Sequence, residues 1–426
     1  MSTTLMSPTD AVTGARERMQ HAKSAARTVG LLSAQRKSDV LHAVAARLEA
    51  DTDLIIDANT ADLDRGRETG ISEALQDRLR LDAARVAALA AAVRDVAELP
   101  DPVGRVLEER RLDNGLSLTK VTVPFGVVGS IYEARPNVTV DIAALALRSG
   151  NAVVLRGGSA AENSNRALIA SMRAALESVG VDAEAIQTVD DFGRDGARAM
   201  MQARGLIDVL VPRGSAQLIE TVVTESTVPV IETGAGLVHI VLDESARADW
   251  ALDIVVNAKA QRPSVCNAVE TVLVHRGAAD RLVPDLVGAL QAAGVTVHGD
   301  ADVSARAEGV IPATPEDWAT EYLSLDVAIR VVDDLDAALE HIRTYSSQHT
   351  ESIITEDPAA AERFLAEVDS AVVMVNSSTR FTDGGEFGFG AEVGISTQKL
   401  HARGPMGLPE LTSSKWLVRG AGQVRG

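Results

Sequence analysis

Cysteine is almost absent from this chain of 426 residues, because Cys266 is the only one. A single cysteine excludes an intramolecular disulfide, which favours a reducing compartment. Aromatic residues make up only 3% of the chain, which argues against platforms for stacking nucleic-acid bases. Long apolar runs are missing as well. The longest tract, around 86–99, contains Arg94, Asp95 and Glu98, and is too short and too charged to span a bilayer.

Positive charge is scarce relative to negative charge. The chain has 41 Lys and Arg against 60 Asp and Glu, a formal net charge of −19. The electric field of this negative charge repels nucleic acid and anionic membranes, so we expect neither as a partner. An anionic substrate would need a local cluster of arginines and backbone N–H groups. Residues 1–10 show no basic start followed by an apolar stretch, so we expect no signal peptide and a cytoplasmic location.

The length of the chain exceeds what one core normally fills, which predicts two or three lobes. Residues 9–99 have helical spacing throughout, and Ser33 is placed to cap a helix. Two β-prone stretches then flank Asp113-Asn114-Gly115, which predicts a two-stranded arm within 106–123. An exposed arm of this kind has an edge that can pair with another chain, so we expect a homo-oligomer.

After the arm, apolar strands alternate with helices in the rhythm of a parallel sheet. A first series of strand candidates lies at 126–131, 152–155, 186–189 and 207–211, and a second at 271–274, 328–332, 352–354 and 371–375, beginning near Leu237. Gly234-Ala235-Gly236 between them is a candidate hinge or crossing point. The pattern predicts an α/β protein with two Rossmann-like lobes.

Two turns of the first series carry arginine, glycine and serine directly after a strand. They are Arg156-Gly157-Gly158-Ser159 and Arg213-Gly214-Ser215. A strand that runs through such a turn into a helix presents backbone N–H groups to a phosphate. Neither turn is a G-x-G-x-x-G fingerprint, and small residues are needed at a helix entry in any case. Together they predict a nucleotide-phosphate site, and the two arginines favour NADP over NAD.

Cys266 lies in the polar, proline-bearing run 261–268. Such a position favours a nucleophile, because a thiolate needs access together with nearby positive charge or backbone N–H groups, which Arg262 and the turn could supply. The alternative is a small buried apolar residue, which is what most free cysteines are.

Several segments resemble the gamma-glutamyl phosphate reductase family, in the same order and over nearly the whole length. They are 124–129, 132–141, the turn at 156–158, 257–259 leading into the Cys266 run, 317–323, 345–351 and 407–416. The family belongs to the aldehyde dehydrogenase superfamily. The resemblance therefore implies a cofactor-binding domain (1–105 and 122–236), a catalytic domain (237–400), and an oligomerisation arm with a C-terminal tail (106–121 and 401–426).

The same resemblance implies NADPH-dependent reduction of L-glutamyl 5-phosphate to L-glutamate 5-semialdehyde with release of phosphate, a step of proline biosynthesis, through a thioester on Cys266. The residue roles that we carry over are Asn137 with the Cys266 N–H for the oxyanion, Glu321 for the nicotinamide ribose, and Arg135, Arg262 and Asn267 for the substrate. A turn-forming role for Asn137 and a solvated helix-end charge for Glu321 remain open. No histidine pair has ligand spacing, so we expect no metal.

Glu232 leaves an alternative open. It lies roughly where hydrolytic aldehyde dehydrogenases have a general base, and an active base there would favour oxidation of a small aldehyde. Glu232 could also be a vestige of such a base or a loop carboxylate, and we favour the loop carboxylate, because a competent base would waste the thioester by hydrolysis. A non-catalytic subunit is a third hypothesis, which Cys266, Arg156 and Glu321 oppose. A glutamate 5-kinase would make the unstable substrate, and contact between the two enzymes is left open.

Overall fold

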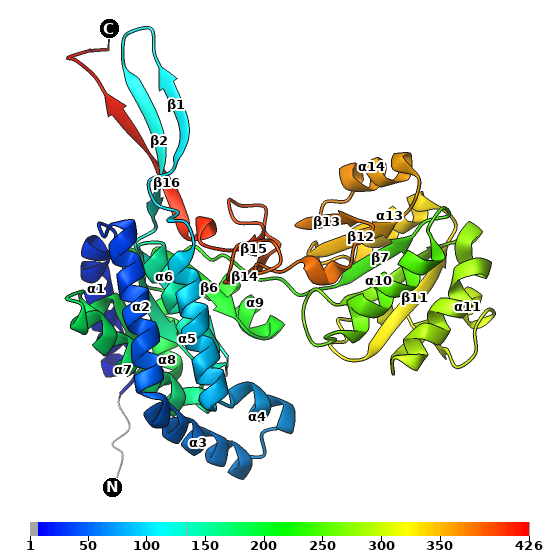
Figure 1. Ribbon diagram of the computed structural model, residues 1–426, viewed down its shortest axis with the longest axis horizontal. Coiled ribbons are helices and arrows are strands. Elements are labelled where there is room, and N and C mark those ends of the chain that lie inside the picture. Colours follow the sequence, from blue (N-terminus) through cyan, green and yellow to red (C-terminus); the bar gives the residue numbers. More distant parts are fainter. Residues whose placement is uncertain (1–6, 134, 426) are drawn as a thin grey trace. The chain divides into compact units, whose positions relative to one another are not determined.

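The computed structural model describes residues 7–133 and 135–425, which form two compact units (Figure 1). The first unit holds the described residues up to Thr233, Phe389–Gly394 and the chain from Met406 onward. The second holds Gly234–Gly388 and Ile395–Pro405. These bounds differ from the predicted ranges at 234–236, which belong to the second unit, and beyond 388, because the chain returns to the first unit at Phe389 and again at Met406. The predicted domains gave 237–400 as one continuous range, so they could not describe a chain that passes between the two units several times.

Helices occupy the beginning of the first unit, as the spacing of its apolar residues predicts. They are α1 (Pro8–Val29), α2 (Ala34–Ala50), α3 (Thr52–Glu68), α4 (Glu73–Leu79) and α5 (Ala83–Glu98). The Ser33 side chain accepts the N–H of Arg36, which confirms the predicted cap of α2. Buried alanine, valine and leucine side chains on α2 and α5 allow these two helices to pack closely.

A parallel sheet forms the centre of the first unit. Its strands, as described, are β3 (Val127–Tyr132), β4 (Ala152–Arg156), β5 (Ile186–Thr188) and β6 (Val209–Arg213), in the order β5-β4-β3-β6. The intervening and following helices are α6 (Pro136–Arg148), α7 (Glu162–Ser178), α8 (Gly193–Met201) and α9 (Ala216–Glu225). Because β4 and β6 lie on opposite sides of β3, the strand order reverses there. Sheets of this kind bind ligands at the carboxyl ends of the strands beside such a reversal.

The predicted arm is present, with one strand more than expected. β1 (Val106–Arg111) and β2 (Ser117–Pro124) pair antiparallel around the Asn114-Gly115 turn. β16 (Thr412–Arg419) pairs with the other edge of β2, from Thr412 opposite Pro124 to Arg419 opposite Ser117. The arm is therefore three-stranded, and Figure 1 shows it extending away from the helices of its unit. The residues of the turn predicted the hairpin, but they carry no information about β16, which lies far away in the sequence.

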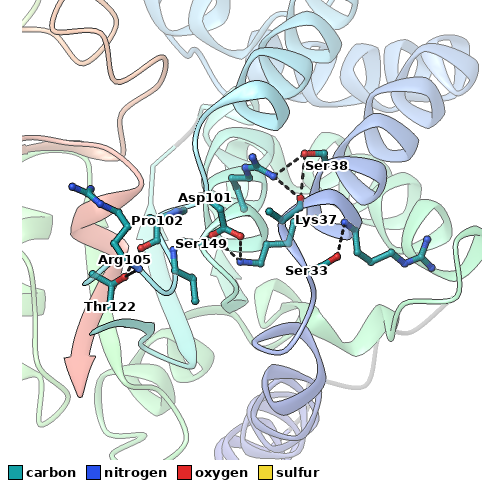
Figure 2. A network of polar contacts seen from close by, with 12 residues as sticks. Ser33, Lys37, Ser38, Asp101, Pro102, Arg105, Thr122 and Ser149 are labelled. Atoms are coloured by element: carbon teal, nitrogen blue, oxygen red, sulfur yellow. Dashed lines mark hydrogen bonds and ion pairs between the residues drawn. The ribbon is translucent and has the colours of Figure 1, made fainter. Parts of the chain in front are cut away.

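The root of the arm is fixed to α2 by buried polar contacts (Figure 2). The Lys37 ammonium, with 1% of its side chain exposed, lies 2.9 and 2.8 Å from the two carboxylate oxygens of Asp101. The Thr122 hydroxyl donates to the carbonyl of Pro102 and accepts the N–H of Arg105. These contacts tie the first residues of the arm both to the helices and to β2.

A second parallel sheet forms the centre of the other unit. Its order, as described, is β10-β9-β11-β8-β7-β12-β13. The strands are β7 (Val238–Leu242), β8 (Val269–His275), β9 (Thr296–Gly299), β10 (Ile311–Pro312), β11 (Asp326–Val332), β12 (Thr350–Ile354) and β13 (Val372–Val375). Ile240 and Leu242 pack in one buried cluster and Val241 in another, so both faces of β7 are covered. Strands buried on both faces read as continuous apolar runs.

Helices α10 (Ala248–Ala260) and α11 (Arg276–Ala292) contribute to the first of these clusters, and α13 (Leu335–Tyr345) and α14 (Pro358–Glu367) to the second. The short elements are α12 (Ala301–Ser304), β14 (Gly394–Ser396), β15 (Gly404–Met406) and the 3-10 turns Ser159–Ala161, Ala183–Ala185, Asp190–Phe192, Asp317–Ala319, Thr379–Phe381 and Pro409–Leu411. In the part of the chain that the structure describes, no helix has the length and apolar character needed to cross a membrane.

Candidate active site

Cys266 lies at the amino-terminal edge of the second sheet. It directly precedes β8, while Gly236 precedes β7 and Glu321 precedes β11. These three strands are neighbours and run parallel, so the segments that lead into them meet at one edge. Cys266 is half-buried in its turn, between the exposed Arg262 and the buried Asn267. The turn thus gives the thiol partial access to solvent.

A buried ion pair closes the segment that carries Cys266. The Lys259 ammonium at the end of α10 lies 2.6 Å from the Glu270 carboxylate in β8, with 0% and 1% of the two side chains exposed. Burial raises the pKa of Glu270 to about 7, against the opposing effect of Lys259. Burial also lowers the pKa of Lys259, while Glu270 raises it. The pair joins the two ends of the cysteine turn, and sequence spacing gave no signal of it.

Glu321 lies close to the cysteine turn through Gly236. Its Oε1 accepts the N–H of Gly236 at 2.7 Å. A Cβ on Gly236 would lie 1.6 Å from the carbonyl oxygen of Cys266, so only glycine permits this approach. The structure therefore brings two predicted site residues, Glu321 and Cys266, to the same place within one unit.

Asn267 holds a second segment against the cysteine turn. Its amide nitrogen donates to the carbonyls of Arg380 and Thr382, and its own carbonyl accepts the hydroxyl of Thr379. Its side-chain oxygen is buried without a hydrogen-bond partner. The amide nitrogen of Asn267 is thus engaged in joining two turns, and Arg380, which the sequence did not indicate, lies beside the site.

In the first unit, the turn after β4 differs from the expected phosphate cradle. The N–H of Gly157 donates to Asp190, and the N–H groups of Asn163 and Ser164 donate to the buried carboxylate of Asp62 from α3. These donors at the start of α7 are therefore engaged within the protein. The sequence missed Asp62 because this cap comes from a distant helix. Gly158 and Ser159 lie between Gly157 and α7.

Arg156 lies at the carboxyl end of β4 with its Nε buried and without a hydrogen-bond partner. Asp190 is close enough for the two charges to interact, and burial raises the pKa of Asp190 to about 6, against the Gly157 N–H and Arg156. A buried guanidinium N–H without a partner is costly, so this position fits an anionic group.

The turn after β6 contains the second group of predicted cofactor residues. Ser215 caps α9 through the N–H of Leu218, and its hydroxyl donates to Glu133 at 2.6 Å. A Cβ on Gly214 would lie 2.8 Å from the Glu133 carboxyl carbon. An exposed carboxylate therefore lies at the N-terminus of α9, where the helix dipole favours negative charge.

Asn137 and Arg213 are both close to Asp141. The amide nitrogen of Asn137 donates to Asp141 at 3.2 Å, at the exposed start of α6. Burial raises the pKa of Asp141 to about 6, against this hydrogen bond and the charge of Arg213. Arg135 is the N-cap residue of α6 and is exposed. Glu232 is half-buried in the last residues before the chain leaves this unit.

Three histidines of the second unit, His239, His341 and His349, are buried in the fold. Burial lowers the pKa of His349 to about 4, and burial together with His239 and Arg330 lowers that of His341 to about 3. Within the described residues, no three His, Cys, Asp or Glu side chains are grouped to hold a metal ion. The expectation of no metal stays a prediction.

Two α/β units, each built on a parallel sheet, with a cysteine-bearing turn at one edge of the second sheet, define the fold class of the aldehyde dehydrogenases. The model of the aldehyde dehydrogenase family matches residues 6–308. An acetylating aldehyde dehydrogenase from Geobacillus thermoglucosidasius has the same fold at 16% identity, with a TM-score of 0.70 and coverage of 98% of this chain and 99% of that one.

More similar proteins narrow the assignment. Gamma-glutamyl phosphate reductase of Leifsonia xyli subsp. xyli is 64% identical over 99% of this chain and 100% of its own length. That of Thermobifida fusca is 58% identical over 98% and 100%. The crystal structure of the Thermotoga maritima enzyme of that name has a TM-score of 0.94 at 43% identity, covering 96% of this chain and 99% of that one. The chain belongs to the gamma-glutamyl phosphate reductase family, a group of oxidoreductases within the aldehyde dehydrogenases.

Proposed function

We propose that the protein reduces L-glutamyl 5-phosphate to L-glutamate 5-semialdehyde with NADPH and releases phosphate, as a step of proline biosynthesis. The observation that carries the proposal is the Cys266 turn, in a chain that matches family members named for this reaction over nearly its whole length. The chain has one thiol, and that thiol lies at an accessible sheet edge beside arginines.

Cys266 attacks the acyl carbon as a thiolate. The new C–S bond forms while the C–O bond to phosphate breaks, and its electron pair leaves with the phosphate oxygen. An acyl phosphate is an activated acyl donor, so this displacement needs no strong general acid. Arg262 favours the thiolate over the thiol and lies where the departing phosphate is released. The product is a thioester on Cys266.

All the proposed cofactor residues except Glu321 lie in the first unit. The buried, unpartnered Nε of Arg156 fits the extra ribose phosphate of NADPH, with Gly157, Gly158 and Ser159 beside it. Arg213 ends β6, and Gly214 and Ser215 follow it, next to the reversal of strand order, where a pyrophosphate is favoured. Glu321 is assigned to the nicotinamide ribose. When bound, NADPH supplies the hydride that reduces the thioester carbon.

The chain must also stabilise the oxyanion that precedes release of the aldehyde. We assign this to the Cys266 backbone N–H and the Asn137 amide. Collapse of the tetrahedral adduct breaks the C–S bond and returns the thiolate. Arg135, Arg262 and Asn267 complete the substrate-binding set. The first unit is then the cofactor-binding domain, and the second is the catalytic domain.

Assembly and location complete the proposal. The arm exposes large apolar side chains, including Val106, Leu107, Trp416 and Val418. Its outer strands β1 and β16 offer open edges, which favour pairing between copies of the chain. We propose a cytoplasmic homo-oligomer that receives its unstable substrate from a glutamate 5-kinase.

The test is the reverse reaction. NADP reduction by glutamate 5-semialdehyde is followed by absorbance, with and without inorganic phosphate and with Cys266→Ala as the control. Phosphate-dependent NADPH formation that disappears in Cys266→Ala supports the proposal. Turnover without phosphate refutes it, because water would then be the acyl acceptor and Glu232 its general base.

A further inference from the structure

Hydrogen bonds fix the position of Arg380 next to Gln261, the residue that precedes Arg262. Its Nε donates to the Gln261 side chain at 2.9 Å, and its backbone N–H donates to Ser378. Ser378 in turn donates to Asn257 near the end of α10. Together with the contacts from Asn267, these bonds fix Arg380 to both sides of the cysteine turn. In the described part of the chain, its two terminal nitrogens make no hydrogen bond or ion pair.

Arg380 is half-buried beside another positive charge. Burial and then Arg262 lower the pKa of Arg380, while Asp383, Cys266 and Glu386 raise it. Two adjacent guanidinium groups repel each other, and the partial burial of one weakens its hydration. The arrangement becomes favourable when an anion binds between them. In a chain with a net charge of −19, such a local concentration of positive charge is what an anionic substrate requires.

We propose, on the basis of the proposed function, that Arg380 and Arg262 together bind the phosphoryl group of the acyl phosphate beside Cys266. Phosphate oxygens accept two parallel N–H bonds from the fork of a guanidinium, and the terminal nitrogens of Arg380 offer this fork. As the C–O bond breaks, the electron pair moves onto the phosphate oxygen that leaves. The arginine pair stabilises this developing charge, which makes Arg380 a specificity residue for phosphate over water or a thiol as the partner in acyl transfer.

The substrate also carries an α-carboxylate, and an arginine binds both kinds of anion. The reverse reaction separates them, because inorganic phosphate and glutamate 5-semialdehyde enter as different molecules and only the aldehyde carries the carboxylate. Arg380→Gln removes the charge and the fork, while Arg380→Lys keeps the charge but loses the fork. Arg363→Gln is the matched control, since Arg363 is an exposed arginine of the same unit that pairs with Glu367 and Asp336.

We expect the KM for phosphate to rise about 10- to 100-fold in Arg380→Gln, as for loss of a charged hydrogen-bonded pair, and less in Arg380→Lys. The KM for the aldehyde should stay within about twofold of wild type. Alkylation of Cys266 by iodoacetamide reports whether the turn is intact. If Arg380→Gln does not fold, Arg262→Gln replaces it, because that side chain is exposed, and the expected direction is the same.

A rise in the KM for the aldehyde with an unchanged KM for phosphate overturns the proposal and assigns the arginine pair to the carboxylate. Unchanged values for both also overturn it. Failure of the proposed function is a separate result, because the wild-type enzyme would then turn over without phosphate.

Discussion

The ion pair between Lys259 and Glu270 provides a quantitative test of how the cysteine turn is held. Lys259→Met leaves a carboxylate that is 1% exposed without its partner at 2.6 Å. Breaking a buried pair in this way costs about 3–5 kcal/mol, and Glu270→Leu should cost a similar amount. Independent effects would sum to about 6–10 kcal/mol. The double variant leaves no buried charge, so we expect its stability to lie within about 1 kcal/mol of wild type.

The effect of Lys259→Met should depend on pH. Burial raises the pKa of Glu270 from its ordinary value of 4.5 to about 7 in the folded state. A carboxyl group whose pKa is raised by folding contributes stability at pH values below its unfolded-state pKa. This contribution is lost as the pH rises through the folded-state pKa. Without Lys259 the folded pKa rises further, so the variant loses stability over a window that extends above pH 7. Its deficit should therefore be larger at pH 8 than at pH 6, with a limiting slope of about 1.4 kcal/mol per pH unit.

Urea unfolding followed by tryptophan fluorescence measures these differences. Trp250 and Trp318 lie in the second unit and Trp416 in the arm, so a Trp416→Phe background limits the signal to the unit that contains the pair. Alkylation of Cys266 is followed in parallel. A loss below about 1 kcal/mol in both single variants, or a double variant as unstable as their sum, would refute the reasoning.

Four further predictions concern other parts of the chain. Asp62→Ala should destabilise the first unit by about 2–3 kcal/mol in urea unfolding, because α7 loses its cap, and an unaffected midpoint would contradict this. Glu133→Gln should tighten NADPH binding about two- to fivefold by calorimetry, since a carboxylate leaves the start of α9, and weaker binding would show a supporting role instead. The pKa of His349 is about 4 in the folded state, so its neutral form contributes stability that is lost as pH falls from about 6.5. His349→Gln should reduce the loss between pH 7 and pH 5 by about 2 kcal/mol, which unfolding at both pH values measures. Thr122→Val should cost about 1–3 kcal/mol and speed hydrogen exchange at the root of the arm (Figure 2), whereas unchanged exchange would show that water replaces the hydroxyl.

Local patterns predicted most of the elements. Alternating apolar strands and helices indicated both sheets, and the Asn114-Gly115 turn indicated the hairpin. Strands β9 and β10 did not appear in the prediction, because Thr296–Gly299 contains a single aliphatic residue and Ile311–Pro312 is only two residues long, so neither forms an apolar run. β16 was also missed as a strand of the arm, because pairing between segments this far apart leaves no local signal.

The candidate site also contains residues that the sequence indicated and residues that only the structure revealed. Cys266 and the arginine turns could be predicted as candidates from residue type and setting, and their roles stay predictions. Arg380, Asp62 and the partner of Lys259 became visible only through contacts across the fold, where a distant side chain completes a turn or a helix end. Asp62 in particular changes the interpretation of the turn at Arg156, because it occupies N–H groups that the sequence assigned to a phosphate.

The third strand of the arm has a consequence for the order in which the molecule is made. β2 leaves the ribosome long before β16, and until Thr412–Arg419 emerge one edge of β2 has no partner. The first unit also needs this part of the chain for a buried hydrogen bond, because the side chain of Asn151 donates to the carbonyl of Leu411. The arm therefore gains its third strand only after the strands of both parallel sheets have been synthesised, and a chain interrupted before Thr412 would carry β2 with one edge unpaired.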